Sequence, residues 1–146
     1  PQIQHEGGNF CNFLSWSKRG WCKAEEVSRR LSHFNKMVVV VESEKQSFLH
    51  DSHDYLCHAV GTGEFSCCDM HHMVDGNPIP CDKIKVSAVV QKLLHDRISQ
   101  LDSSSLPLNI FFHRFLKSMN PSLLRGLPNV PTTQEGDLAS FLKDLR

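Results

Sequence analysis

The chain has 146 residues, the length of one domain, and a domain of this size buries about 70% of its unfolded surface. Its 16 basic residues balance 16 acidic ones, so no overall field attracts a phosphate backbone, and we expect no nucleic-acid partner. The longest apolar run, Met37 to Val41, is far shorter than the roughly 20 residues that cross a bilayer, so we expect no transmembrane segment. Six cysteines and nine histidines are the unusual feature of the composition.

The first third of the chain predicts an extended segment, a helix and a buried strand. Residues 1–9 are polar and contain two adjacent glycines, which is typical of an extended entry segment. From Lys18 to His33, apolar residues recur every three or four positions, which predicts an amphipathic helix with Glu26 and Arg30 facing solvent. The β-branched run at 37–41 lacks alternation, which predicts a strand buried on both faces.

The middle of the chain predicts a β-hairpin and a surface loop. The runs 55–60 and 64–69 flank Gly61-Thr62-Gly63, whose glycines can adopt positive φ, and this pattern is typical of two strands joined by a tight turn. Residues 71–80 contain the turn cluster Asp-Gly-Asn-Pro and lack periodicity. We expect them to form a loop at the surface.

The last part of the chain predicts three helices. Asp82 can cap a long helix that reaches Leu101 and carries one apolar stripe. A second helix, from Leu106 to Met119, is expected to end at Asn120-Pro121. Residues 121–131 form a Pro-rich connector, and a capping box at Thr132 opens a C-terminal helix.

Together these elements predict a single α/β domain over residues 1–146. We expect a small sheet with a buried central strand and a β-hairpin, packed by three to four helices.

The segment from Ser15 to Glu25 resembles one part of the TIR-like fold. It reads Ser-x-x-x-x-x-Trp-Cys-x-x-Glu. In that family a strand ends in Ser, a short loop follows, and the next helix opens with Trp-Cys-x-x-Glu. The family then continues into a buried strand, which 37–41 matches in position, so the resemblance implies a TIR-like first part. The Arg-Gly-Trp-Cys stretch is also similar to a motif of uncharacterised proteins of unicellular algae.

The resemblance implies a catalytic role for Glu25 and a cofactor-binding role for Trp21. In enzymatic TIR-like proteins the motif's Glu is the catalytic carboxylate of a nicotinamide-releasing cleavage of NAD, where it can stabilise an oxocarbenium-like cation. The residues by themselves also fit a second interpretation, in which Glu25 is an exposed carboxylate paired with Arg29 and Trp21 is a core anchor.

The cysteines and histidines leave three alternatives open. The paired C-x-x-C spacing of a zinc ribbon is absent, so spacing alone favours no metal. If the 61–63 turn forms, Cys57 faces Cys67 across the hairpin, and the pair can bind metal, oxidise or pack as small apolar side chains. The candidate ligands of a zinc site joined to the hairpin are Cys57, Cys67, His71, His72 and Cys81.

Our first functional prediction is a non-catalytic interaction module or accessory subunit of a larger assembly, built on a degenerate TIR-like half-domain. Only twenty residues precede Trp21, fewer than the family's nucleotide pocket needs, so we expect self-association or docking to a protein partner instead. Phe111, Phe112 and Phe115 occupy more of their helix than one buried stripe requires, which indicates an interaction surface.

Two alternatives accompany this prediction, and each brings its own ligand. One is an NAD-cleaving hydrolase that uses Glu25, with NAD as its substrate, and the other is a zinc-stabilised adaptor. The first prediction requires no cofactor. The given chain shows no charged-then-apolar leader, so its start does not indicate a compartment. We expect a soluble protein, of the cytoplasm or of an organelle, the plastid if the source is an alga.

Overall fold

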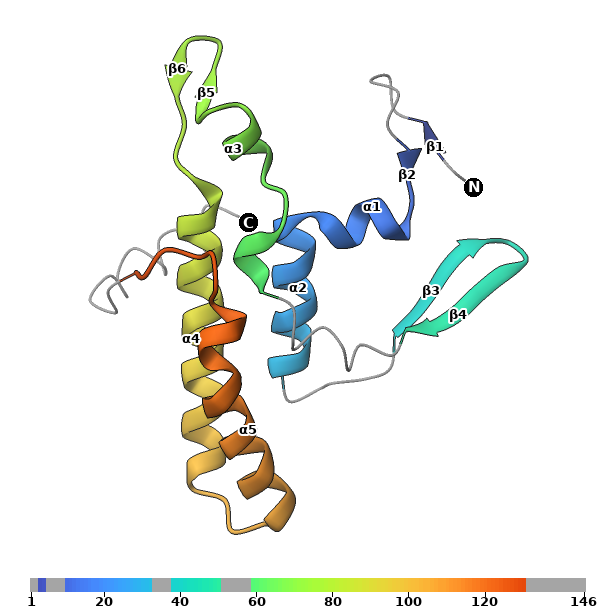
Figure 1. Ribbon diagram of the computed structural model, residues 1–146. Coiled ribbons are helices and arrows are strands. Elements are labelled where there is room, and N and C mark those ends of the chain that lie inside the picture. Colours follow the sequence, from blue (N-terminus) through green and yellow to red (C-terminus); the bar gives the residue numbers. More distant parts are fainter. Residues whose placement is uncertain (1–2, 5–9, 33–37, 51–58, 131–146) are drawn as a thin grey trace, which may run out of the picture.

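The computed structural model describes residues 3–4, 10–32, 38–50 and 59–130, and Figure 1 shows how their elements are arranged. The described part is a mixed helix and strand structure whose body consists of α2 (Gly20–Leu31), α4 (Asp82–Asp102) and α5 (Pro107–Leu123). The shorter helical elements are α1 (Phe13–Lys18), α3 (Ser66–Asp69) and a 3-10 turn, η2 (Val60–Thr62). The strands form three antiparallel pairs among these residues: β1 (Ile3–Gln4) with β2 (Phe10–Cys11), β3 (Val38–Ser43) with β4 (Gln46–His50), and β5 (Met73–Val74) with β6 (Asn77–Pro78).

The long helix predicted from Asp82 is confirmed as α4. Its apolar stripe supplies the buried side chains of Val86, Val90 and Leu94, which follow one another at intervals of four residues. The short connection after Asp102 sends α5 back along α4, so the two helices lie side by side (Figure 1). α5 contributes Leu116, which is fully buried against that stripe.

The second predicted helix does not end at Asn120-Pro121. Pro121 lies inside the last turn of α5, which continues to Leu123. Proline removes one helical hydrogen bond, a loss that is smaller near a helix end than in its middle. The side chain of Leu123 is fully buried, so core packing holds this turn in place. The connector therefore begins at Leu124, and the predicted C-terminal helix after residue 131 lies outside the described residues.

The helix predicted from Lys18 to His33 is confirmed as α2, which begins at Gly20 because a break at Arg19 separates it from α1. Arg19 has the extended angles φ −70° and ψ 136°, and it forms a parallel bridge with Glu64. The backbone N–H of Gly20 donates to the Glu64 carbonyl at 2.7 Å, and the Glu64 N–H donates to the Lys18 carbonyl at 2.9 Å. The break therefore serves to dock residues near Glu64 beside the start of α2.

The hairpin predicted from 55 to 69 is wrong over its described part. Residues 60–62 form η2 and residues 66–69 form α3, while 55–58 lie outside the described residues. The glycines serve close backbone approach instead of a turn: a Cβ on Gly63 would lie 2.4 Å from the Cα of Gly20, and one on Gly61 would lie 2.1 Å from the carbonyl carbon of Gly126. Long-range packing, invisible in a local pattern, therefore explains the two glycines.

The strand predicted at 37–41 exists as β3, but it is not a buried central strand. Among the described residues it pairs with β4 alone, and its side chains alternate between two faces that differ in exposure. Val39 and Val41 are 56% and 70% exposed, whereas Val38 and Val40 point to the half-buried face. On the β4 side of that face, Phe48 and His50 make edge contacts with the ring of Phe13 in α1.

The core lies between α2, α4 and α5, with η2 and α3 closing one end. Its buried members come from all five elements and the residues beside them: Ala24, Val27, Leu31, Val60, Phe65, Cys67, Val86, Val90, Leu94, Leu101, Leu116 and Leu123. No helix in the described part is long and apolar enough to cross a membrane.

Candidate metal centre

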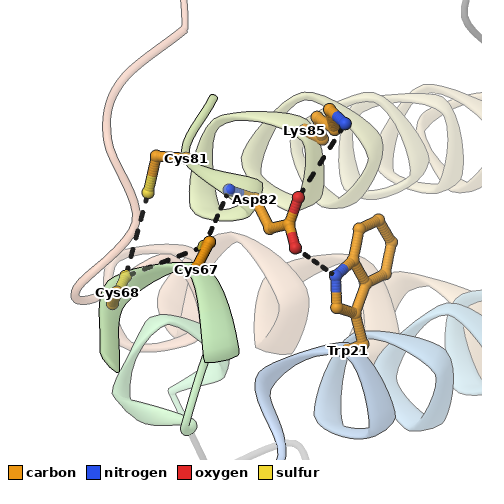
Figure 2. Close-up of polar contacts among 6 residues, drawn as sticks. All are labelled: Trp21, Cys67, Cys68, Cys81, Asp82 and Lys85. Atoms are coloured by element: carbon orange, nitrogen blue, oxygen red, sulfur yellow. Dashed lines mark hydrogen bonds and ion pairs between the residues drawn. The ribbon is translucent and has the colours of Figure 1, made fainter. Parts of the chain in front are cut away.

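Four metal-ligating side chains converge between α3 and the start of α4. They are Cys67, Cys68, His72 and Cys81, and their ligand atoms all lie within 4.8 Å of one another. The Sγ atom of Cys68 lies 4.0 Å from that of Cys67 and 3.9 Å from that of Cys81 (Figure 2). The three cysteines are free thiols in the structure.

α3 and the turn after it bring His72 back to the cysteines. The His72 N–H donates to the Cys67 carbonyl at 2.7 Å, and the His71 N–H donates to the Cys68 carbonyl at 3.0 Å. Both histidines have left-handed backbone angles, with φ values of 51° and 59°. This conformation costs a non-glycine residue about 1–2 kcal/mol. Strain of this kind persists where local contacts or a ligand offset it.

The β5–β6 hairpin then carries the chain from His72 to Cys81. Its turn uses Asp75 and Gly76, both with positive φ, which suits a tight two-residue hairpin turn. The Ile79 N–H donates to the His72 carbonyl at 2.8 Å and closes the hairpin on the ligand side. Cys81 follows directly as the N-cap residue of α4. The hairpin and the start of α4 therefore place Cys81 next to the two cysteines of α3.

The N-terminus of α4 points at the cluster and connects it to α2. The Asp82 backbone N–H donates to Cys67 Sγ at 3.3 Å, at the helix end whose partial positive charge stabilises a thiolate. The Asp82 carboxylate accepts a hydrogen bond from the Trp21 indole at 3.2 Å and lies 3.8 Å from Lys85 Nζ (Figure 2). The cluster is therefore supported by contacts from both helices.

The spacing of the ligand atoms fits tetrahedral zinc. Zinc binds thiolate at about 2.3 Å, which places two sulfurs of a tetrahedral site about 3.8 Å apart. The two observed sulfur separations, 3.9 and 4.0 Å, are close to that edge length. In addition, Nδ1 of His72 is buried and finds no hydrogen-bond partner in the described part. An unpaired buried polar atom costs about 1–3 kcal/mol, and coordination to a metal would satisfy it.

The electrostatics of the three thiols also favour a bound cation. Burial, the largest cause, raises the pKa of the Cys68 thiol to about 11, and hydrogen bonds with Cys81 and Cys67 and repulsion between the thiolates add to the effect. Several thiolates cannot ionise together in this space without a cation. A divalent metal ion reverses this balance, because it deprotonates the thiols that bind it.

The structure brings together three of the five predicted zinc ligands. Cys67, His72 and Cys81 are in the cluster, but His71 is exposed beside it and contributes no ligand atom. Cys57 lies outside the described residues.

Cys68 is the ligand that the sequence prediction missed. A strand over 64–69 would have pointed neighbouring side chains to opposite faces, whereas the helical turn of α3 lets Cys67 and Cys68 reach one site. The signal was the Cys-Cys-x-x-x-His spacing that leads to His72.

The residues of the TIR-like segment occupy a different part of the molecule. Glu25 is exposed on α2. Trp21 is 38% exposed, so it is not the core anchor of the second interpretation; its indole bonds to Asp82 instead. The proposed pairing of Glu25 with Arg29 is also replaced, because Arg29 pairs with Glu26.

Glu26, predicted to face solvent, is 5% exposed and forms the centre of a buried ion network. Its Oε1 atom lies 3.0 Å from Arg29 Nη2, 3.5 Å from Arg30 Nε and 3.8 Å from His50 Nε2. Arg30 is also buried, against prediction. His50, the last residue of β4, lies beside Glu26 and contributes to its burial. The network therefore ties the β3–β4 pair to the helical body.

The three predicted interaction residues differ in exposure. Phe111 is 66% exposed, whereas Phe112 and Phe115 are partly buried against the core. Phe115 stacks on both other rings, with centroid distances of 6.5 Å to Phe111 and 6.3 Å to Phe112. Phe111 is thus the member available to a partner.

Comparisons with known proteins add no relative: no family model, no curated protein and no solved structure matches the chain.

Proposed function

We propose that this chain is a zinc-stabilised adaptor, a non-catalytic module that contacts another protein. The observation that carries the proposal is the convergence of three cysteine sulfurs and a buried imidazole nitrogen at Cys67, Cys68, His72 and Cys81. Four protein ligands complete a tetrahedral zinc shell and leave no position for water or substrate, which is the arrangement of structural zinc sites.

Zinc at this position would tie together elements that have little core of their own. α3 is four residues long, and each strand of the β5–β6 hairpin has two residues, so neither element is stable in isolation. The cluster connects both to the N-terminus of α4, whose stripe forms the centre of the core. Metal binding would therefore contribute directly to the free energy of unfolding.

The proposed contact with another protein rests on the exposed face of α5. We infer a protein partner whose surface combines acidic and apolar side chains. Leu108 is 76% exposed and Phe111 66%, an unusual density of exposed apolar surface on one helix. Arg114 and Lys117 are exposed on the same helix, and no Asp or Glu occurs from residue 103 to 130. A second copy would place these positive charges against each other, so charge complementarity favours an acidic partner over self-association.

Metal analysis with reconstitution tests the zinc half. We expect one zinc ion per chain and a lower melting temperature after chelation.

Zinc affinity should also depend on pH. Binding displaces protons from three thiols, among them Cys68 with its raised pKa of about 11. Since protons compete with zinc, affinity should rise with pH, by up to roughly 1,000-fold per unit while all three thiols are protonated in the metal-free protein. Competition titrations at pH 6.5 and 8 measure this slope. A chain that retains no zinc, or melts identically after chelation, contradicts the proposal.

Selection of random 18-residue peptides displayed on phage, against the zinc-loaded protein, tests the partner half. We expect enrichment of peptides that combine Asp or Glu with large apolar residues, because these complement Arg114 and Lys117 beside Phe111. Binding of the selected peptides should fall at least tenfold in Phe111→Ser and persist in Ile84→Ser, which also replaces an exposed apolar side chain, on α4, with serine. Absence of enrichment, peptides without acidic residues, or binding that survives Phe111→Ser would each speak against this partner.

A further inference from the structure

We propose that Cys68 is a site of oxidation by hydrogen peroxide, that Cys81 resolves it to a disulfide, and that this disulfide expels the metal. The inference rests on the proposed zinc centre and names its regulation. It follows from the unequal surroundings of the three sulfurs.

Cys68 is the sulfur best placed to meet an oxidant. Cys68 and Cys81 are both half-buried, whereas Cys67 is only 3% exposed, so exposure favours Cys68 and Cys81 over Cys67. The Sγ atom of Cys67 also accepts the Asp82 N–H at 3.3 Å, so the first turn of α4 covers it on one side. Cys68 is moreover the sulfur that lies within 4.0 Å of each of the other two. A peroxide that reacts at Cys68 therefore leaves a neighbouring thiolate in place to complete a disulfide.

Backbone geometry selects Cys81 over Cys67 as the resolving cysteine. Adjacent Cα atoms are about 3.8 Å apart across a trans peptide, which is below the range of about 4.4–6.8 Å found for disulfides. Cys67 and Cys68 are adjacent and belong to one helical turn, so a bond between them would distort α3. Cys81 lies 3.9 Å away, sulfur to sulfur, and its extended backbone precedes the first turn of α4. Its side chain can close the remaining distance without breaking a helix.

The chemistry balances with hydrogen peroxide as the oxidant. The Cys68 thiolate attacks one peroxide oxygen, the O–O bond breaks, and a sulfenic acid forms with release of hydroxide. The Cys81 thiolate then attacks the sulfenic sulfur, the S–O bond breaks, and a second hydroxide leaves as the disulfide forms. Two sulfurs each lose one electron, peroxide gains two, and two protons from solvent convert the hydroxides to water.

Disulfide formation removes two of the four ligands at once. The remaining pair, Cys67 and His72, cannot complete a tetrahedral shell, so the metal dissociates. A dithiol reductant reverses the step and restores the ligand set. The centre would thus hold zinc in a reducing compartment and release it under oxidative stress.

The test uses the full chain loaded with zinc and treated with hydrogen peroxide, with a chromogenic zinc indicator and peptide mapping by mass spectrometry as readouts. We expect one zinc ion released per chain, one disulfide between Cys68 and Cys81, and zinc uptake again after reduction. Cys22, buried on α2 outside the cluster, should remain a thiol. The variant Cys81→His keeps four possible ligands but cannot form the bond, so its zinc should be released at least tenfold more slowly.

The outcomes separate this inference from the proposed function. A chain that binds no zinc before treatment removes the zinc centre itself. A chain that binds zinc but retains it with all thiols intact, or that forms a disulfide between Cys67 and another residue, overturns the oxidation of Cys68 while the zinc centre stands. If Cys81→His fails to bind zinc, peptide mapping of the oxidised wild-type chain still tests the inference, because it shows whether Cys68 and Cys81 form the disulfide.

Discussion

Replacing Cys67 with serine is expected to abolish stoichiometric zinc binding and to lower the melting temperature by roughly 15 °C in zinc-containing buffer. Zinc at 1,000 times its dissociation constant stabilises the folded chain by about 4 kcal/mol, and each kcal/mol shifts the melting temperature of a chain this size by about 4 °C. Cys67 is the most buried ligand, and its sulfur anchors the N-terminus of α4 through the Asp82 N–H. Differential scanning calorimetry with and without zinc measures the loss.

The matched control is Cys22→Ser. Cys22 is also a buried free cysteine, but it belongs to α2 and not to the cluster. This variant places a hydroxyl in a buried site as well, so it reports the packing cost alone and should keep both its zinc and its response to chelation. If both variants melt at the same temperature with and without zinc, the cluster has no structural metal.

Replacing Glu26 with alanine should destabilise the protein by about 3 kcal/mol. Removing one partner of a buried ion pair typically costs about 3–5 kcal/mol, and we expect the low end because the Arg29 side chain is 26% exposed. Arg30 and His50, each 8% exposed in the side chain, lose their contact with the Glu26 carboxylate. Urea unfolding monitored by circular dichroism measures the change in the free energy of unfolding.

Glu25→Ala is the control, since Glu25 is the next residue in the sequence, has the same side chain and is exposed. A surface substitution of this kind usually changes stability by less than about 0.5 kcal/mol. Equal losses in the two variants would mean that the Glu26 network contributes nothing specific. The same control addresses the NAD-cleaving alternative, which stays a prediction: nicotinamide release by the wild-type chain that disappears in Glu25→Ala would establish it.

The predicted elements with long-range periodicity agree well with the structure, and the short ones do not. α4 and most of α5 follow from apolar stripes that extend over several turns, because such stripes need only one covering partner to become stable. The sequence around Gly61 and Gly63 predicts a hairpin because glycine is typical of tight turns. In the fold both glycines permit backbone contact with residues distant in the sequence, which no local pattern can reveal.

The sequence by itself determined the chemistry available to this protein: no net charge, a long amphipathic helix, and cysteines and histidines between residues 67 and 81. Three of the four cluster ligands were named from it. Only the tertiary structure decided which of these side chains meet. A helix in place of a strand at 66–69 brings Cys68 into the cluster. The left-handed turn after this helix directs His72 toward the cysteines and leaves His71 exposed. The same holds for Glu26 and Glu25: both are helix carboxylates in sequence, but Glu26 is buried beside Arg30 and His50, whereas Glu25 is exposed.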